Sequence, residues 1–399
     1  MKIEFGGSHR DAISIARNEK PKRNSPLIDY ALAGLDRCWL PEHGRWSHIY
    51  HLDGRAEPNE SVPQSDVFYT LNVLLGMSRL NQIPASVDVR SVFERNAGQL
   101  TRLPVPEYAF GMALWAAAAL YLEIPREVRA HVDRLLSDEA SWSRLRAQDV
   151  GMLLMGLVAQ AKIDRSEWYR PMVRLFGFLA RRHRGPSGLF FDSYLGFGRR
   201  FGTFATQTYL AMACYHYGEF AGDPIAIEAA NSCVRKLIAL QGPHGEWPWF
   251  FDVQRGTVLD FYEVYSVHQH GMAPALLECA ERHGVPGATE ALARGFKWVL
   301  GENQLGLPML VPELQLSIRS QVRKRELRTK AFRALRALRN AYVPRPACLE
   351  DSSAIGLRLE CRSYELGWIL WSFGARSDLA MLTHHPAFAG ALPTSKPAA

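Results

Sequence analysis

The sequence predicts an all-α protein in which six helical hairpins form two concentric rings. Almost entirely apolar segments, such as 107–123, alternate along the chain with segments that carry charges along one side, such as 125–137. A helix that is apolar on all sides is buried, whereas a helix with a charged stripe faces water on that side. No strand pattern of comparable strength competes, although the long loops could contain short strands. The alternation therefore places one helix of each hairpin in an inner ring and the other in an outer ring.

The first outer helix is predicted over 25–39, where Pro26 suits the first helical turn. The other outer helices are predicted at 86–100, 125–137, 166–183, 223–241 and 288–301. The inner helices are predicted at 66–80, 107–123, 148–162, 204–220, 265–283 and 361–376. Connections from an inner helix to the next outer helix are short, about one to five residues, as in packed helical pairs. The long loops therefore all fall at one end of the ring, where we expect a site.

These helices form a single predicted domain over 25–376. An insertion, 302–360, separates the last outer helix from the last inner helix. Residues 1–24 are predicted to form a flexible basic arm, and 377–399 a loosely held tail. Length alone would suggest two or three domains, but a helical ring of this size folds as one.

The composition indicates an ordered globular protein, with 47% hydrophobic and 11% aromatic residues. The N-terminal segment is polar and lacks the apolar core of a secretory signal. The longest apolar run, 110–122, is shorter than the roughly 20 residues that a membrane-spanning helix needs. We therefore expect a cytoplasmic protein.

The six cysteines contain no CxxC pair, and most lie in apolar helical surroundings. Reduced cysteines in the core are the expected state. No ligand spacing supports a zinc site. The sequence therefore predicts neither a metal nor another cofactor.

Positive charge is concentrated in the insertion. Residues 319–339 contain nine Lys or Arg and one acid, Glu326, so this segment accounts for the whole net charge of +7. Apolar residues repeat there at helical spacing, namely Leu327, Ala331, Leu335, Leu338 and Tyr342. The pattern predicts a basic amphipathic helix that either covers the rim of the ring or, through 319–342, contacts an anionic membrane surface or a polyanion. Nothing beyond charge indicates nucleic acid, which is not expected as a partner.

Two sequence words are the most distinctive, GEWPWFFD at 245–252 and YSVHQHGMAP at 265–274. They resemble a family of proteins linked to bacterial exopolysaccharide production. The layout of the hairpins resembles the six-hairpin (α/α)6 toroid superfamily, which includes unsaturated glucuronyl hydrolases, polysaccharide lyases and uronyl epimerase-like proteins. This resemblance covers nearly the whole chain. It implies a carbohydrate-active enzyme, a hydrolase, lyase or epimerase, that acts on an acidic or lipid-linked bacterial polysaccharide or oligosaccharide.

A second resemblance leaves another function open. Gln241, Gly245 and Trp247 form a Q-x3-G-x-W motif that is similar to the repeat motif of the toroidal triterpene cyclases. The acidic motifs of such enzymes, DxDD and DDxxD, are absent. A toroidal isoprenoid or terpene cyclase acting on a diphosphate or polyene is therefore a further possible function. A non-catalytic partner in polysaccharide assembly is a third.

Candidate catalytic residues lie at the N-terminal ends of the inner helices and in the long loops. Glycoside hydrolysis needs two carboxyl groups, and a Tyr/His couple suits proton abstraction beside a uronate carboxylate. The candidates are Asp66, Asp149, Asp252, Glu263, Tyr265 and His268. His270 lies about 200° around the helix from His268, so the two cannot share one ligand. Each acid could instead cap a helix or turn, and His268 could be a hydrogen-bonded core residue.

Candidate substrate-binding residues are aromatic, acidic or basic side chains at the same end of the ring. Aromatic rings stack on sugar faces, carboxylates bind hydroxyl groups, and arginines suit an anionic substrate. The set is Trp46, Tyr69, Tyr108, Asp192, Arg199, Arg200, Gln207, Trp249, Tyr364 and Glu365. Arg199 and Arg200 could instead belong to a solvated loop.

Overall fold

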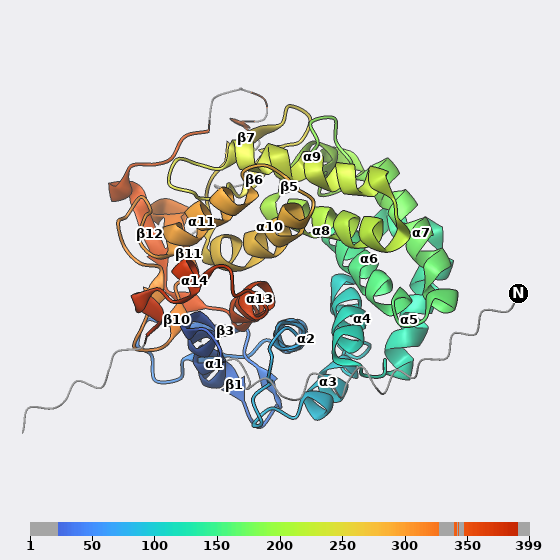
Figure 1. The fold of residues 1–399 in the computed structure, drawn as a ribbon, viewed down its shortest axis with the longest axis horizontal. Coiled ribbons are helices and arrows are strands. Elements are labelled where there is room, and N and C mark those ends of the chain that lie inside the picture. Colours follow the sequence, from blue (N-terminus) through green and yellow to red (C-terminus); the bar gives the residue numbers. More distant parts are fainter. Residues whose placement is uncertain (1–22, 327–338, 341, 343–346, 390–399) are drawn as a thin grey trace, which may run out of the picture.

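Two concentric rings of helices surround a common axis in the computed structural model, which describes residues 23–326, 339–340, 342 and 347–389 (Figure 1). The inner ring consists of α2 (Pro63–Met77), α4 (Tyr108–Leu120), α6 (Ala147–Ala161), α8 (Phe204–Ala221), α10 (Ala273–Arg282) and α13 (Ser363–Phe373). The outer ring consists of α1 (Pro26–Cys38), α3 (Val89–Ala97), α5 (Arg126–Ser137), α7 (Arg165–Arg182), α9 (Pro224–Leu240) and α11 (Ala288–Val299). All twelve predicted helices are present, so the predicted fold class is confirmed.

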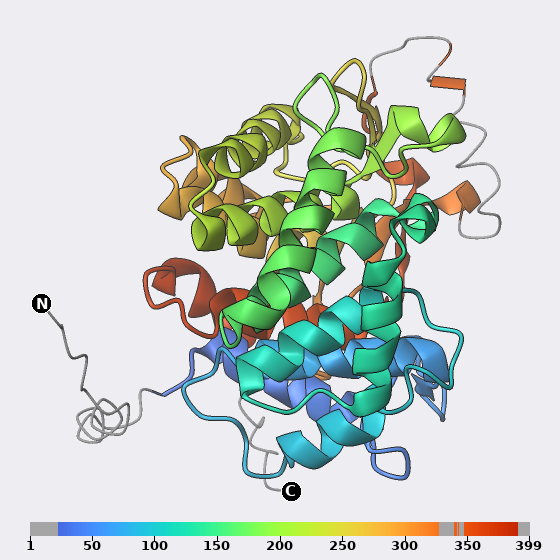
Figure 2. The same cartoon turned by 90° about the vertical axis from the view of Figure 1, so that its right-hand side faces the viewer.

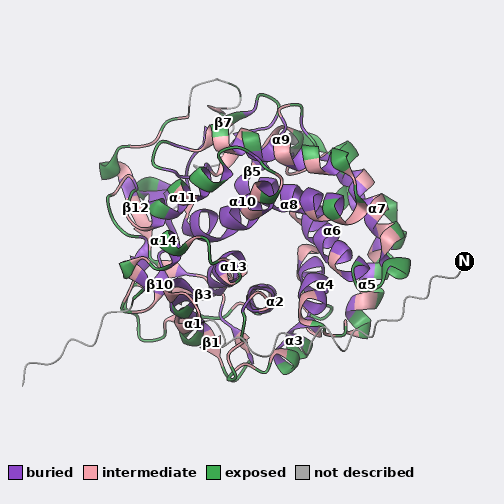
Figure 3. Ribbon diagram, viewed as in Figure 1, coloured by how far each residue is buried: buried purple, intermediate pink, exposed green. Residues whose placement is uncertain are grey.

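The burial of each helix follows the alternation in the sequence. In α4, the stretch from Ala109 to Ala118 is buried throughout. In α5, only Val128, Val132 and Leu136 are buried, at the four-residue spacing of one helical face. Figure 3 shows the same contrast around the ring, with buried inner helices and outer helices exposed on their outward side.

Glycines let neighbouring inner helices approach closely. A Cβ atom on Gly76 in α2 would overlap the backbone carbonyl of Gly367 in α13, and one on Gly111 in α4 would overlap the backbone at Met152 in α6. No side chain therefore separates these neighbouring helix backbones at either contact.

The inner helix predicted at 265–283 begins with an irregular turn. His268–Met272 form a π-helical turn, η4, and regular helix α10 follows. Pi turns inside helices are rare and occur frequently at functional sites.

Short strands form in the long loops. One sheet orders β12 (Ile355–Arg358), β11 (Ser320–Arg323) and β8 (Val264–Tyr265), with Ser320 opposite both Tyr265 and Arg358. A second joins β13 (Glu360–Cys361), β3 (Ile49–His51) and β4 (Asn59–Glu60), and a third joins β5 (Phe201–Thr203), β6 (Phe250–Asp252) and β7 (Thr257–Asp260). Two-stranded pairs are β1 (Trp39–Leu40) with β2 (Arg45–Trp46) and β9 (Leu310–Val311) with β10 (Leu316–Ser317). In the side view of Figure 2, the loop that carries η3 (Gly196–Arg200) projects on the right-hand side of the molecule.

The basic segment 319–342, which contains the predicted amphipathic helix, begins with a strand and a short turn. Residues 320–323 form strand β11, and Lys324–Glu326 form a single 3-10 turn, η5. The strand forms because its backbone pairs with β8 on one side and β12 on the other. Residues 339–340 and 342 are helical, while 327–338 lie outside the described residues.

The C-terminal tail differs from the prediction because its first part is folded. Residues Ala380–Thr383 form α14, and Pro386–Phe388 form the 3-10 turn η7. The Phe388 ring lies 5.4 Å from that of Tyr30 in α1 and 6.1 Å from that of Phe296 in α11. The tail therefore packs across the first and last outer helices.

None of the helices in the described part of the chain is long and apolar enough to cross a bilayer. The six cysteines are all free, and Cys348 alone among them is exposed.

Candidate active site

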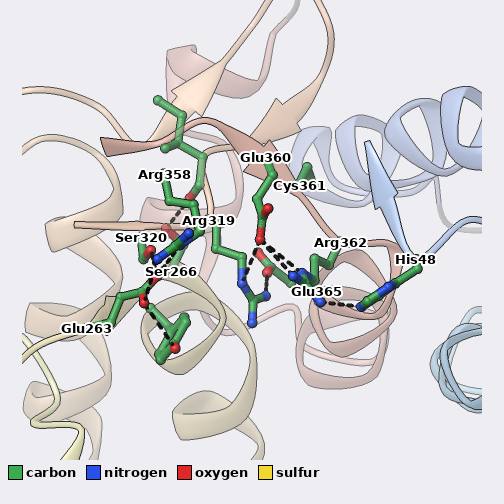
Figure 4. Close-up of polar contacts among 12 residues, drawn as sticks. His48, Glu263, Ser266, Arg319, Ser320, Arg358, Glu360, Cys361, Arg362 and Glu365 are labelled. Atoms are coloured by element: carbon green, nitrogen blue, oxygen red, sulfur yellow. Dashed lines mark hydrogen bonds and ion pairs between the residues drawn. The ribbon is translucent and has the colours of Figure 1, made fainter. Parts of the chain in front are cut away.

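Arg319 occupies the centre of a polar cluster at the N-terminal end of α13. It immediately precedes β11, and its guanidinium forms an ion pair with Glu365. The same group donates a hydrogen bond to the Tyr364 hydroxyl at 3.3 Å and lies 3.5 Å from the Glu360 carboxylate. The Tyr265 ring lies beneath it, at 4.8 Å from the guanidinium carbon. Figure 4 shows Arg319 directed toward Glu365 and Glu360.

Arg362 extends the cluster toward the loop that precedes α2. Its guanidinium donates to Glu360 at 2.9 Å and to the Tyr69 hydroxyl at 3.3 Å, and it contacts the His48 ring (Figure 4). The Tyr69 and Tyr364 rings lie 4.5 Å apart. Tyrosines from α2 and α13 thus pack side by side beneath two arginines.

Glu263 anchors the opposite side of the cluster. Arg358 donates to its carboxylate at 2.7 Å, Ser320 donates a further hydrogen bond, and the Tyr265 hydroxyl donates to it at 3.3 Å. These contacts follow from the sheet register, which sets Ser320 beside both Tyr265 and Arg358. Glu263 thereby holds Tyr265 in place, and the adjacent arginine keeps the pKa of this carboxyl below its ordinary value against the effect of burial.

His268 is buried beside Tyr265 and carries no charge at neutral pH. The two rings lie 5.1 Å apart, and Phe204 packs 4.7 Å away on the His268 ring. Burial, followed by the nearby charge of Arg319, lowers the pKa of His268 to about 3. Its Nδ1 atom has no hydrogen-bond partner among the described residues. A neutral imidazole with an unused nitrogen can accept or donate a proton when a substrate supplies the partner.

Glu365 is the carboxyl group best placed to exchange a proton near neutral pH. It is fully buried at the start of α13. Burial raises its pKa to about 7, although Arg319 and Arg362 act in the opposite direction. One carboxyl oxygen, Oε2, has no partner within the described part of the chain. The protonated and ionised forms are therefore both populated at pH 7.

The structure brings Tyr69, Glu263, Tyr265, His268, Tyr364 and Glu365 of the predicted residues into this one cluster. They come from segments that are far apart in the sequence. Tyr108 lies at the edge, with its ring 4.6 Å from Phe68, next in sequence to Tyr69. Burial raises the pKa of the Tyr108 hydroxyl to about 12.

Two predicted catalytic acids at helix starts have structural partners instead. Asp66 accepts hydrogen bonds from Ser61 and from the Val62 backbone at the start of α2. Asp149 accepts from the backbone N–H groups of Arg146 and Tyr108, each at 2.9 Å, and so ties α6 to α4. Because these contacts stabilise helix N-termini, they do not support a catalytic role for Asp66 or Asp149.

Three further predicted residues form hydrogen bonds that stabilise loops, namely Asp252, Asp192 and Gln207. Asp252 accepts from Arg200 at 2.9 Å and from backbone N–H groups in the β6–β7 turn. Asp192 accepts from the Thr203 backbone at 2.9 Å. Gln207 pairs with both backbone polar groups of Phe190. Because these side chains already have partners within the protein, the structure does not support a catalytic role for Asp252 or substrate binding by Asp192 and Gln207.

The remaining predicted residues lie outside the cluster. Trp46 is buried beside Trp39, with ring centroids 4.8 Å apart, next to a surface cavity between α1 and α3. Trp249 stacks on Phe250 at 4.9 Å, and Arg199 is exposed. Arg200 forms an ion pair with Asp252 at 2.9 Å.

The main residues that sequence reasoning missed are Arg319, Arg358 and Glu360. Arg319 was assigned to the basic segment 319–342 and its proposed anionic partner, because that segment is so rich in arginine. A usable signal is present in RLECR at 358–362, where charged residues alternate with apolar ones at the period of a strand. Such a strand with charges on one face, next to an inner helix, indicates a polar site at the ring end.

The described residues contain no group of three or more His, Cys, Asp or Glu side chains placed to bind a metal ion. In the cluster, each carboxylate is instead paired with arginine. The arrangement is suited to proton transfer and to binding an anion.

Solved structures of carbohydrate-active enzymes share this architecture. The epimerase "Cellobiose 2-Epimerase from Bacillus thermoamylovorans B4167" superposes with a TM-score of 0.60 at 9% identity, covering 88% of this chain and 97% of that chain. The chain has the (α/α)6 toroid fold. An inactive variant of the alpha-1,6-mannanase GH76A of Salegentibacter sp. HEL1_6, in complex with alpha-1,6-mannotriose, gives a TM-score of 0.54 at 12% identity, covering 89% and 98% of the two chains. A glycosyl hydrolase of family 88 from Bacteroides vulgatus gives 0.54 at 11%, covering 88% and 97%.

No protein-family model and no curated protein matches the sequence. At identities of 9 to 12%, the structural likeness establishes the toroid and leaves the role of each residue to the geometry of this chain.

Proposed function

We propose that this protein is a carbohydrate-active enzyme that moves a proton on an acidic sugar, in the manner of a uronate epimerase or lyase. The observation that carries the proposal is the convergence of Arg319, Tyr265, His268 and Glu365 at the N-terminal ends of the inner helices. The (α/α)6 fold supports it, since neighbours with this fold include a mannanase and a cellobiose epimerase.

An acidic substrate suits the charge of the cluster. Arg319, Arg358 and Arg362 face Glu263, Glu360 and Glu365. When Glu365 is protonated, the cluster carries an excess of one positive charge. A substrate carboxylate can take the place beside Arg319, and planar guanidinium groups bind carboxylates well.

In the proposed reaction, His268 removes the proton from the carbon next to the sugar carboxylate. The electrons of the broken C–H bond delocalise into that carboxylate, whose negative charge Arg319 stabilises. In an epimerisation, protonated Glu365 returns a proton to the same carbon on its other face. In an elimination, the electrons form a C=C bond as the C–O bond to the leaving sugar breaks, and Glu365 protonates the leaving oxygen. Binding of the anion raises the pKa of His268 and makes it a stronger base.

Glycoside hydrolysis is the second candidate, favoured by one observation. A general acid in hydrolysis needs a raised pKa, which burial gives to Glu365. The partner carboxylate would have to be Glu263 or Glu360, and arginines hold both of them. Proton abstraction uses the available groups with less rearrangement, and we therefore place it first.

A terpene cyclase and a membrane-bound assembly partner receive less support. A terpene cyclase predicts a dry, aromatic-lined cavity with at most one isolated acid, whereas this cluster holds three acids and three arginines. A peripheral contact with an anionic membrane or polyanion remains a proposal for residues 324–342 in a cytoplasmic protein. Arg319 and Arg323 are bound to internal acids and do not contribute to such a surface.

The test is incubation of the purified protein with uronate-containing oligosaccharides in D2O, followed by mass spectrometry, ultraviolet absorbance and a reducing-end assay. Epimerisation gives deuterium incorporation, elimination gives the absorbance of an unsaturated uronate, and hydrolysis gives new reducing ends alone. His268→Gln and Glu365→Gln should each lower kcat about 100-fold or more. Lys297→Gln, on the exposed face of α11, should leave kcat unchanged.

A pH profile adds an independent readout. If protonated Glu365 is the acid, kcat falls as the pH rises through about 7, and Glu365→Gln removes this limb. Full turnover in both the His268 and the Glu365 variants would refute the proposed site.

A further inference from the structure

A second cavity, here called the axial cavity, lies at the opposite end of the barrel from the Arg319 cluster. Its volume is about 320 Å³. Five inner helices contribute to its wall, including Trp115 in α4, His216 in α8 and Trp371 in α13, and Arg79 follows the end of the sixth, α2. Small-molecule sites begin at about 300 Å³, so the cavity can hold one ring-sized ligand.

Arginine–glutamate pairs form one side of the axial cavity. Arg79 binds Glu278 at 2.7 Å, and Arg282 binds Glu219 at 2.9 Å. Both acids are thereby neutralised, and neither is available to attract a cation.

Two further polar groups in the wall have no such partner. The side chains of Lys162 and His216 both line the axial cavity, and neither has a hydrogen bond or ion pair to another residue in the described part of the chain. Burial, followed by the charge of Lys162, lowers the pKa of His216 to about 4, so its neutral ring has one N–H to donate. Together with the two arginines, Lys162 gives the cavity wall three positively charged side chains against two carboxylates. The unused groups are therefore donors in a site with an excess of positive charge.

Aromatic rings form the remaining wall. The Trp115 and Trp371 rings lie 4.9 Å apart, edge to face, and the His216 ring lies 5.4 Å from Trp115. Trp371 is half-buried. Arg79 already lies over the Trp371 ring, 5.0 Å from its centroid, so a ligand ring can pack only against the remaining exposed part of Trp371 while a carboxylate on the same molecule reaches Lys162.

We propose that the axial cavity binds a small organic acid of monosaccharide size, such as a free sugar acid. Lys162 and the N–H of His216 hold the carboxylate, and the ring packs against Trp371. This site is independent of the proposed reaction, because it uses residues from the other end of each inner helix. Basic residues at helix C-termini also interact favourably with the helix dipole, so the experiment must separate binding from that stabilising role.

The experiment is calorimetric titration of the full chain with glucuronate as the probe and with glucose as the uncharged comparison. We expect saturable binding of glucuronate and at least tenfold weaker binding of glucose. Lys162→Gln and His216→Phe should each weaken glucuronate binding about tenfold or more, because the first removes the positive charge beside the carboxylate and the second removes an N–H donor to it. Lys297→Gln makes the same change of charge on α11 and should have no effect.

Glu365→Gln locates the binding event, because it alters only the Arg319 cluster and should leave this affinity unchanged. Three results would overturn the proposal: no binding of glucuronate, equal binding of glucose, or binding lost in Glu365→Gln but retained in Lys162→Gln and His216→Phe. A loss of thermal stability in Lys162→Gln with unchanged affinity would assign Lys162 to the helix dipole alone and also overturn it.

Discussion

Burial sets the protonation state of the histidines near the ring axis. His268 and His270 both lie in the π-helical turn η4, and burial lowers the pKa of each to about 3. Both nitrogens of His270 lack a hydrogen-bond partner among the described residues. The native protein therefore holds these rings neutral, whereas an unfolded chain protonates them below its ordinary pKa of about 6.5.

This difference predicts that acid destabilises the protein. A lowered native pKa means that the unfolded state binds more protons, so the stability present above pH 6.5 is lost as the pH falls toward 3. For one such histidine, the free energy of unfolding falls by about 2 kcal/mol between pH 7 and pH 5. His270→Leu should reduce the pH-dependent loss by about this amount, as measured by urea unfolding at both values. An unchanged difference between the two pH values would show that His270 is protonated in the native state.

Acidic side chains at the helix starts show why residue type alone could not identify the site. Asp149 and Glu365 both lie in the first turn of an inner helix and are buried. Asp149 accepts two backbone hydrogen bonds, whereas Glu365 faces Arg319 and keeps one oxygen free of partners in the described structure. The first is a structural contact, and only the second leaves a group able to exchange a proton.

At the scale of elements, strand β11 creates the site. It lies between β8 and β12 and so carries Arg319 from the insertion to the start of α13. The arginine at the end of this strand, Arg323, binds Asp260 at 2.7 Å and Glu350 at 2.6 Å and so ties the strand to two neighbouring segments. Residues 319–326 of the basic segment therefore belong to the N-terminal end of the inner ring, and the rest of the segment follows residue 326.

The close approach of inner helices predicts opposite effects at two helical glycines. Gly76→Ala should lower the free energy of unfolding by about 1–3 kcal/mol, because the new Cβ overlaps the Gly367 carbonyl, a backbone atom. Gly177→Ala, in outer helix α7, meets only the flexible end of Arg181 and should be neutral or stabilising by up to about 1 kcal/mol. Urea unfolding of the two variants checks this contrast, and equal destabilisation would contradict it.

At the scale of the whole molecule, the tail closes the ring. The first and last outer helices, α1 and α11, meet through Phe388, which is 4% exposed. The two hairpins at the ends of the chain are therefore joined by residues that lie beyond the last inner helix.

Because Phe388 joins the two ends of the ring, we expect Phe388→Ala to destabilise the protein strongly. The substitution should lower the free energy of unfolding by about 3–5 kcal/mol, as for other buried phenylalanines. Met381→Ala, a residue of α14 that is 92% exposed, is the matched control and should change it by less than about 0.5 kcal/mol. Denaturant unfolding measures both, and similar values for the two variants would show that the tail is not part of the cooperative unit.

The sequence by itself determined the ring. Burial of the inner helices and the charged faces of the outer ones are encoded locally, at the spacing of helical turns, so α4 and α5 could be predicted from their own residues. It also placed Tyr69, Tyr265, His268, Tyr364 and Glu365 at one end of the ring, because the N-terminal ends of inner helices converge in such a ring.

Only the tertiary structure decided which of these residues meet and what charge they carry. Arg319 reaches Glu365 through strand pairing between segments about 40 to 55 residues apart, a contact that no local pattern contains. Asp66 and Asp149 accept hydrogen bonds from nearby backbone N–H groups, and Asp252 accepts them from an arginine in a distant loop. The pKa values of His268 and Glu365 depend on burial by the whole ring. A side chain acquires its chemistry from its neighbours in space, and those neighbours are set by packing rather than by sequence distance.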